Sequence, residues 1–354
     1  MEIRLKRGVT AAMATAALPI LRRLDPEFAH DLGLLGLKCT TALWPERSWP
    51  SELSVRCFGL QFEHAVGLAA GFDKNGDYLD ALGALGFSHI ELGTVTPRPQ
   101  PGNPKPRMFR IPGSLALINR MGFNNKGVDH LVEQLSRSRY EGIRGISIGK
   151  NFDTPLERAQ DDYLACLRKV YPHADYVAVN VSSPNTARLR ELQDRDGLQR
   201  VLSPLLEERA ILQRRHGRHV PLLVKVAPDL NEAQICVLAQ EVRSLQLDGV
   251  IATNTSSDLN VPGRPQAATH GGLSGAPLHP LSLRIIGQLR AELGADFPII
   301  GVGGIVSADT ALETLRAGAN LLQIYTGFAY RGADLIEEIT GGLPRSVSSQ
   351  EAKN

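Results

Sequence analysis

The 354-residue sequence contains few cysteines and no excess of charge of either sign. Its four cysteines, Cys39, Cys57, Cys166 and Cys236, stand far apart and form no CxxC pair. The pattern indicates neither a zinc site nor a disulfide framework, and it is typical of a reducing compartment. Lys and Arg total 39 against 37 Asp and Glu, a net charge of +2 that argues against a nucleic-acid partner.

Several catalytic signatures are also missing. No GxSxG motif is present and no histidine stands in a recognisable triad order, which argues against hydrolysis by a serine triad. No GxGxxG fingerprint opens the fold, which weakens a dinucleotide-binding interpretation. Hydrophobic residues make up 43% of the chain, enough for an ordinary core, so disordered and fibrous classes are excluded.

The N-terminal segment departs from the average composition. Arg4, Lys6, Arg7, Arg22 and Arg23 flank an uncharged run over residues 8–21. This run is shorter than the ~20 residues that span a bilayer. A cleaved signal peptide, an amphipathic helix lying on a membrane surface and an ordinary surface helix all remain possible.

Eight short apolar runs alternate with helical patterns along the rest of the chain. Such runs are typical of parallel strands buried on both faces. They cover residues 65–72, 89–96, 145–151, 176–183, 221–228, 249–255, 298–305 and 321–328. The pattern predicts an α/β fold, a (β/α)₈ TIM barrel, with a doubly wound sheet as the alternative.

The same pattern divides the chain into three parts. We expect an N-terminal helical extension over residues 1–50, the barrel over 51–345 and a polar tail over 346–354. Three connections, 97–117, 184–195 and 256–279, are too long for simple turns and follow strand ends. Barrel enzymes carry their chemistry on that face, so these loops are predicted to be functional.

Amides and hydroxyls gather at the predicted strand ends and in the long loops. They are Lys74, Thr94, Asn119, Asn124, Asn180, Ser183, Asn185, Thr253, Asn254 and Thr255. Asn offers both donors and an acceptor, which complements a ring with alternating N–H and C=O groups such as a pyrimidine imide. Any single Asn could equally be a turn residue.

Lys225 and two glycine-containing segments complete this set. Lys225 lies inside an apolar strand, where its ammonium needs a partner; the edge of a reduced flavin would serve, unless the side chain reaches solvent at the strand end. Gly301-Val-Gly303-Gly304 and Tyr325-Thr326-Gly327 follow strands seven and eight, where barrels commonly bind phosphate.

These motifs resemble the dihydroorotate dehydrogenases, in particular the membrane-associated, quinone-dependent class 2. The motifs that carry the resemblance are VGLAAGFDKNG (66–76), ELGTVTPRPQPGNPKPRMFR (91–110), INRMGFNN (118–125), NVSSPNT (180–186), KVAPDL (225–230), ATNTS (252–256), GGLSG (271–275), GVGGI (301–305) and QIYTGF (323–328). The resemblance implies an FMN-bound barrel that oxidises dihydroorotate to orotate in pyrimidine biosynthesis.

The resemblance also implies roles for individual residues. FMN would be bound by Ala70, Gly71, Phe72, Asp73, Lys74, Thr94, Ser147, Asn180, Lys225, Thr253, Gly275, Gly304, Tyr325 and Thr326. The substrate would be held by Lys74, Asn119, Arg120, Met121, Gly122, Phe123, Asn180, Asn185, Asn254 and Thr255. Ser183 would be the catalytic base, at a position where the soluble class 1 enzymes have Cys. A quinone tunnel would involve His30, Arg110 and Tyr325, although His30 could instead be a helix-surface histidine.

Two positions depart from the family pattern. Ser147 stands where an Asn commonly contacts FMN, and Ala187-Arg188-Leu189-Arg190 replaces the usual Pro-Gly-Leu-Arg. We expect a monomer attached peripherally to the cytoplasmic side of a bacterial inner membrane. A bacterial membrane is favoured over a mitochondrial one because the N-terminus shows no long Ser/Arg-rich presequence followed by a spanning helix. A class 1-like enzyme with another acceptor, or a phosphate-binding barrel without redox chemistry, are the alternatives.

Overall fold

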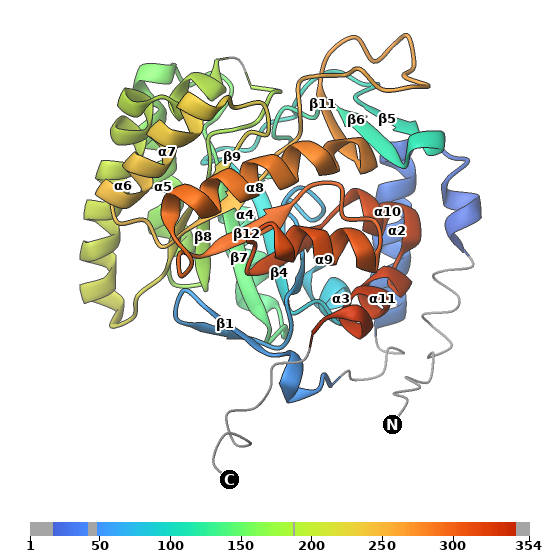
Figure 1. Ribbon diagram of the computed structural model, residues 1–354, viewed down its shortest axis with the longest axis horizontal. Coiled ribbons are helices and arrows are strands. Elements are labelled where there is room, and N and C mark those ends of the chain that lie inside the picture. Colours follow the sequence, from blue (N-terminus) through green and yellow to red (C-terminus); the bar gives the residue numbers. More distant parts are fainter. Residues whose placement is uncertain (1–16, 42–47, 187, 345–354) are drawn as a thin grey trace.

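A computed structural model describes residues 17–41, 48–186 and 188–344 (Figure 1). The basic residues 4–7, the possible cleavage position near residue 16, Ala187 and the polar tail 346–354 lie outside the described residues.

Eight parallel strands close into a barrel, as the apolar runs predict. In chain order they are β3 (Val66–Leu68), β4 (His89–Val95), β7 (Ile143–Ile148), β8 (Tyr176–Asn180), β9 (Leu222–Val226), β10 (Gly249–Ala252), β12 (Ile299–Val302) and β13 (Leu321–Ile324). Pairing of β13 with β3 closes the ring. The (β/α)₈ prediction is confirmed, and the doubly wound alternative is wrong.

Helices surround this barrel (Figure 1). They are α3 (Leu79–Gly83), α4 (Val128–Arg137), α5 (Ala159–Val170), α6 (Arg195–His216), α7 (Glu232–Ser244), α8 (His279–Leu293), α9 (Ala308–Arg316), α10 (Thr326–Arg331) and α11 (Asp334–Gly342). Capping boxes define two of the starts, Asn231 with Gln234 for α7 and Ser307 with Thr310 for α9. These caps place the two helices in the connections after β9 and β12, where the alternating pattern predicts helices.

A hairpin closes the N-terminal end of the barrel. It is formed by β1 (Val55–Cys57) and β2 (Leu60–Phe62), which pair antiparallel. The Phe58 ring lies 5.7 Å from the Tyr176 ring, and the Phe62 ring lies 5.2 Å from His89. Both partners begin barrel strands, so the hairpin covers the end opposite the strand C-termini.

A three-stranded antiparallel sheet lies over the other end. It contains β5 (Met108–Ile111), β6 (Ala116–Asn119) and β11 (Gly272–Gly275), and β6 pairs with both neighbours. Two of the connections predicted as loops, 97–117 and 256–279, therefore contribute strands. The third contains a 3₁₀ turn, η5 (Leu189–Gln193). Each strand has only four residues and β11 is distant in sequence, so no local pattern reveals the sheet.

The described part of the N-terminal extension contains helical residues 17–21 and α2 (Pro26–Thr40). Asp25 caps α2 by accepting hydrogen bonds from the Glu27 and Phe28 amides, and the helix contacts α3 and β5. Phe28, Leu32 and Leu35 are exposed although apolar, and their spacing places them on one helix face. Over the described residues, none of the helices combines the length and apolar character needed to cross a membrane.

Candidate active site

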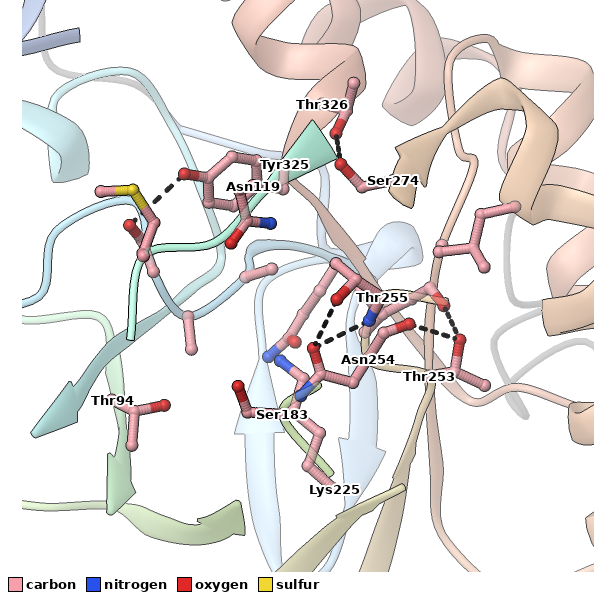
Figure 2. Close-up of a pocket in the computed structure, with 18 of the residues that line it drawn as sticks. Thr94, Asn119, Ser183, Lys225, Thr253, Asn254, Thr255, Ser274, Tyr325 and Thr326 are labelled. Carbon is pink, nitrogen blue, oxygen red and sulfur yellow. Dashed lines mark hydrogen bonds between the residues drawn. The ribbon is translucent and has the colours of Figure 1, made fainter. Parts of the chain in front are cut away.

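A cavity opens at the C-terminal ends of the barrel strands, beneath the three-stranded sheet. It encloses about 1020 Å³, part of which is open to solvent. Figure 2 shows Asn119, Ser183 and Lys225 around it. The predicted site residues that line it are Ala70, Gly71, Lys74, Thr94, Asn119, Met121, Gly122, Phe123, Asn180, Ser183, Asn185, Lys225, Thr253, Asn254, Thr255, Gly275, Gly304, Tyr325 and Thr326.

Some predicted site residues do not line this cavity. They are His30, Phe72, Asp73, Arg110, Arg120 and Ser147. The Asp73 carboxylate accepts hydrogen bonds from backbone amides, including that of Tyr78 at 2.8 Å, and so holds the turn after β3. Arg120 donates to the Pro106 carbonyl at 2.8 Å and lies over the Phe109 ring. These two side chains shape the walls rather than face the cavity.

A chain of hydroxyls and amides joins four barrel strands along one wall. Ser147 Oγ lies 2.9 Å from Thr94 Oγ1, which accepts a hydrogen bond from Asn180 Nδ2 at 2.8 Å. Asn254 Nδ2 in turn donates to Asn180 Oδ1 at 3.2 Å. Ser147 is fully buried behind Thr94, so it orients the wall and does not reach the cavity.

Ser183 also lines the cavity, close to two of the predicted substrate residues. Its Oγ accepts a hydrogen bond from the Asn185 amide at 3.2 Å, and Asn185 Nδ2 donates to Asn119 Oδ1 at 3.1 Å. Within the described ranges, no carboxylate or imidazole is hydrogen-bonded to Ser183. A base at this position therefore needs a relay through a small molecule such as water.

Lys74 supplies a cation at the cavity wall. Burial lowers the pKa of its ammonium to about 8, and the positive charge of Arg107 acts in the same direction. Glu27 and Asp73 oppose this effect. A carboxylate bound in the cavity would raise the pKa again, so Lys74 is suited to binding an anionic group.

Lys225 points into the barrel and has a partner that the sequence analysis missed. Its Nζ lies 3.3 Å from Glu91 Oε1, on β4. Sequence reasoning assigned the partner to a bound flavin, whereas the chain itself supplies a carboxylate. The signal was present, because Glu91 stands within the apolar run 89–96.

The glycines after β12 allow a close approach between segments. A Cβ on Gly304 would lie 2.5 Å from the His279 backbone nitrogen, and one on Gly303 would lie 2.1 Å from Ser282 Oγ. Nearby, Thr326 Oγ1 donates to Ser274 Oγ at 2.9 Å (Figure 2). Ser274 also lines the cavity and was not predicted. Glycine backbone and two hydroxyls thus form the corner predicted to hold phosphate.

Two of the three residues predicted for a quinone tunnel are connected by an aromatic chain. The His30 ring lies 4.8 Å from Phe72, and Phe72 lies 5.3 Å from Tyr325, which lines the cavity. Burial lowers the pKa of His30 to about 4, with the charge of Lys74 adding to the effect, so its ring is neutral at pH 7. Arg110 is placed differently, because its Nη1 donates to the Leu24 carbonyl just before α2, at 2.6 Å.

The loop after Ser183 is held by Arg190. Its guanidinium donates to the Ser182 carbonyl at 3.1 Å and to the Thr255 carbonyl at 2.7 Å, and it pairs with Asp229 at 2.5 Å. These contacts fix the loop against the end of β10. Although residues 188–190 depart from the family pattern, the arginine at its last position, Arg190, is retained and holds the loop.

The chain is similar to known proteins over most of its length. Residues 52–347 match the sequence model of a family described as dihydroorotate dehydrogenase. A protein from Alkalilimnicola ehrlichii named dihydroorotate dehydrogenase (quinone) is 53% identical over 91% of this chain and 96% of its own. One of the same name from Stenotrophomonas maltophilia is 53% identical over 94% and 96%. A crystal structure of DHODH in complex with ferulenol from Eimeria tenella is 36% identical, with a TM-score of 0.81 and 90% of both chains covered.

Proposed function

The chain belongs to the dihydroorotate dehydrogenase family, and on that premise we propose that its cavity binds FMN and dihydroorotate, with a membrane quinone as the final acceptor. It is an oxidoreductase that oxidises dihydroorotate to orotate, a reaction of pyrimidine biosynthesis. The observation that carries the assignment of the site is the convergence of Lys74, Ser183 and the asparagines on one cavity at the strand ends.

The residues around the cavity fit a flavin. Gln323 Oε1 is buried without a hydrogen-bond partner among the described residues, and Gln323 lines the cavity. Such an acceptor requires an N–H donor, which the imide of a flavin ring offers. FMN is a hydride acceptor. Its ring would be held by Ala70, Gly71, Thr94, Asn180, Lys225 and Thr253, and its phosphate by Gly275, Gly304, Tyr325 and Thr326.

Dihydroorotate has an imide edge and a carboxylate, and this cavity complements both. Asn119, Asn185 and Asn254 present side-chain amides. The Asn254 Oδ1 accepts a hydrogen bond from the Thr255 backbone amide at 2.8 Å, which fixes the orientation of the Asn254 side chain. Lys74 neutralises the carboxylate. The backbone of segment 119–123 encloses the ring from the side of the three-stranded sheet. Fixed donors and acceptors of this kind act mainly by positioning the substrate.

Ser183 is the proposed base. It takes the proton from C5 of dihydroorotate while the hydrogen on C6 leaves as hydride, so that a C5=C6 double bond forms. The Asn185 amide donates to Ser183 Oγ and stabilises developing negative charge there. A hydroxyl is a weak base, so its own proton must pass to a water or to Thr186 as the bond to carbon breaks.

The extension is proposed to guide the quinone. α2 carries His30, whose ring contacts Phe72 behind the cavity-lining Tyr325, and its residues Phe28, Leu32 and Leu35 are exposed. An exposed apolar face flanked by the basic Arg22 and Arg23 is suited to the surface of an anionic membrane. We place the protein as a monomer on the cytoplasmic face of a bacterial inner membrane, with Arg110 and Tyr325 along the quinone path.

Anaerobic stopped-flow absorbance tests this function with each substrate separately. FMN-loaded protein should lose its flavin absorbance on mixing with dihydroorotate and regain it on mixing with a short-chain ubiquinone. Protein that binds no FMN, or bound FMN that dihydroorotate does not reduce, would overturn the proposal. Reoxidation only by a soluble acceptor such as fumarate would indicate a class 1-like enzyme instead.

A further inference from the structure

A polar cluster is buried in the barrel interior below the cavity. It consists of Glu91 on β4, Tyr176 on β8, Lys225 on β9 and Gln323 on β13. Glu91 and Tyr176 are 0% exposed, Gln323 is 1% and Lys225 is 5%. Lys225 and Gln323 line the cavity, whereas Glu91 does not. The carboxylate therefore lies beneath the residues that face the cavity.

Three neighbours satisfy the Glu91 carboxylate. Lys225 Nζ lies 3.3 Å from Oε1, and Gln323 Nε2 donates to Oε2 at 2.8 Å. The Tyr176 hydroxyl donates to the same Oε2 at 3.2 Å. Burial and the negative charge of Glu91 raise the pKa of Tyr176 well above its usual value, so the hydroxyl keeps its proton. The carboxylate is thus held from three strands in one orientation.

Each charge of this pair is compensated by the other. Removing one partner of a buried ion pair leaves an uncompensated charge, whereas removing both is often harmless. The Lys225 ammonium is therefore drawn toward Glu91 on one side and faces the cavity on the other. Any negative charge that develops in the cavity competes with Glu91 for the same cation.

We propose that Glu91 is a positioning residue for the redox reaction, which acts through Lys225 to set the reduction potential of the bound flavin. Glu91 holds the ammonium at the cavity floor and compensates part of its charge. Tyr176 and Gln323 fix the carboxylate, and Gln323, which lines the cavity, has an Oε1 without a hydrogen-bond partner among the described residues. The inference rests on the proposed FMN site, but not on the identity of the substrate.

The test is the midpoint potential of bound FMN, measured by reductive titration with mediator dyes. In the Glu91→Gln variant the ammonium lacks its counter-ion, so it stabilises reduced FMN more. The equilibrium between oxidised and reduced FMN should shift at least tenfold toward reduction, which is about +30 mV for a two-electron couple. In a Lys225→Met background the same replacement should shift it less than twofold, because Glu91 acts through Lys225.

Tyr176→Phe is the matched control. It removes one hydrogen bond from the same carboxylate without changing charge, so the potential should stay within about 10 mV, a roughly twofold change. An unchanged or lower potential in Glu91→Gln, an equal shift in the Lys225→Met background, or an equal shift in Tyr176→Phe would each overturn the inference.

Stability gives a second measurement if the single variants fold poorly. Thermal unfolding of the full chain, with and without FMN, should show the double variant Glu91→Gln, Lys225→Met to be more stable than either single variant. A double variant no better than the worse single one would contradict the pairing. Because the titration uses chemical reductant, FMN that is bound but not reduced by dihydroorotate would overturn the proposed function alone.

Discussion

Glu27 and Arg107 form a buried ion pair that ties the extension to the loop above the barrel. Arg107 Nη2 lies 2.7 Å from Glu27 Oε1, and the side chains are only 8% and 11% exposed. Arg107 Nη1 also donates to the carbonyls of Pro101 and Asn103, at 2.6 and 2.9 Å. The amide of Asn103 donates to the Met121 carbonyl in the proposed substrate segment. Helix α2 and the substrate side of the cavity are thus linked through a single guanidinium.

Glu27→Gln should therefore destabilise the protein by about 3 kcal/mol, the range for breaking a buried pair, as measured by urea unfolding. Burial alone would raise the pKa of Glu27, but Arg107 and Lys105 outweigh it and the pKa is lowered. The stabilisation is present above the unfolded pKa of about 4.3 and is lost as pH falls through the lower folded pKa.

Glu133→Gln provides the control for this prediction. Glu133 pairs with Arg137 one helical turn away on α4, with side chains 52% and 70% exposed. Its loss should change the free energy of unfolding by no more than about 0.5 kcal/mol. Equal destabilisation by the two variants would show that the Glu27 pair has no special role.

The lowered pKa of Lys74 leads us to expect that substrate affinity depends on pH. Its pKa is lowered to about 8, mainly by burial, so the free enzyme loses this charge above pH 8. The kcat/KM for dihydroorotate should fall about tenfold per pH unit there, while kcat falls only at higher pH, because the bound carboxylate raises the pKa. Lys74→Met should lose this alkaline limb of kcat/KM together with most of the affinity.

The same shift has a consequence for stability. Between pH 8 and about 10.4 the folded protein binds fewer protons at Lys74 than the unfolded chain does. The contribution of Lys74 to the free energy of unfolding therefore rises with pH across this window. Comparison of urea unfolding of the parent protein and Lys74→Met at pH 7 and pH 9.5 checks the sign.

Ser183→Ala should leave FMN binding intact and slow flavin reduction by dihydroorotate about 10²–10⁴-fold, the usual contribution of a general base. Among the described residues, the hydroxyl hydrogen-bonds only the Asn185 amide, so its loss should not disturb the wall. Ser182→Ala is the matched comparison: the neighbouring hydroxyl donates to Asn180 Oδ1 at 3.3 Å and accepts from Asn254 Nδ2 at 3.0 Å, so its loss should disturb only positioning and slow reduction much less. Stopped-flow absorbance compares them, and undiminished reduction in Ser183→Ala would reject Ser183 as base.

His30 should matter for the quinone half of the reaction. Removing residues 1–45 deletes both His30 and Glu27, so reoxidation of FMN by quinone should slow far more than its reduction by dihydroorotate. His30→Ala should slow reoxidation by quinone while leaving the Glu27 ion pair in place. His30→Phe keeps a ring against Phe72 and should slow reoxidation less. Equal quinone reoxidation in the truncated and parent proteins would rule out the proposed path.

The sequence predicts the barrel strands better than the three-stranded sheet that lies over the cavity. Seven of the barrel strands are buried along their whole length and β7 over its last four residues, so each produces a mainly apolar run that is visible locally. The strands β5, β6 and β11 have four residues each, and Leu273 pairs with Ile118 across more than 150 positions. Their existence depends on that distant pairing, which no local pattern contains.

In the candidate site, too, some features could be predicted from the sequence and others could not. Residues such as Asn180 and Thr253 end strands, so fold and position together predict where they lie. Ion pairs cannot be predicted this way, because Lys225 and Glu91 are 134 positions apart and Arg107 and Glu27 are 80 apart. The role of Ser147 could not be predicted either. The sequence shows only that Ser replaces the family's Asn, whereas the structure shows that the Ser147 hydroxyl hydrogen-bonds Thr94.

Phe28 and Leu35 offer a test of membrane attachment that does not involve the active site. They are 57% and 51% exposed on α2, the helix drawn in blue in Figure 1. Burying such a side chain in the interface contributes about 1.5–3 kcal/mol, so each replacement by Ser should weaken vesicle binding at least tenfold. Ile211→Ser is the matched control, since Ile211 is also 51% exposed but lies on α6. Sedimentation with phosphatidylglycerol-containing vesicles measures the binding. Equal losses in Leu35→Ser and Ile211→Ser, or no loss in either, would show that α2 is not the membrane-binding face.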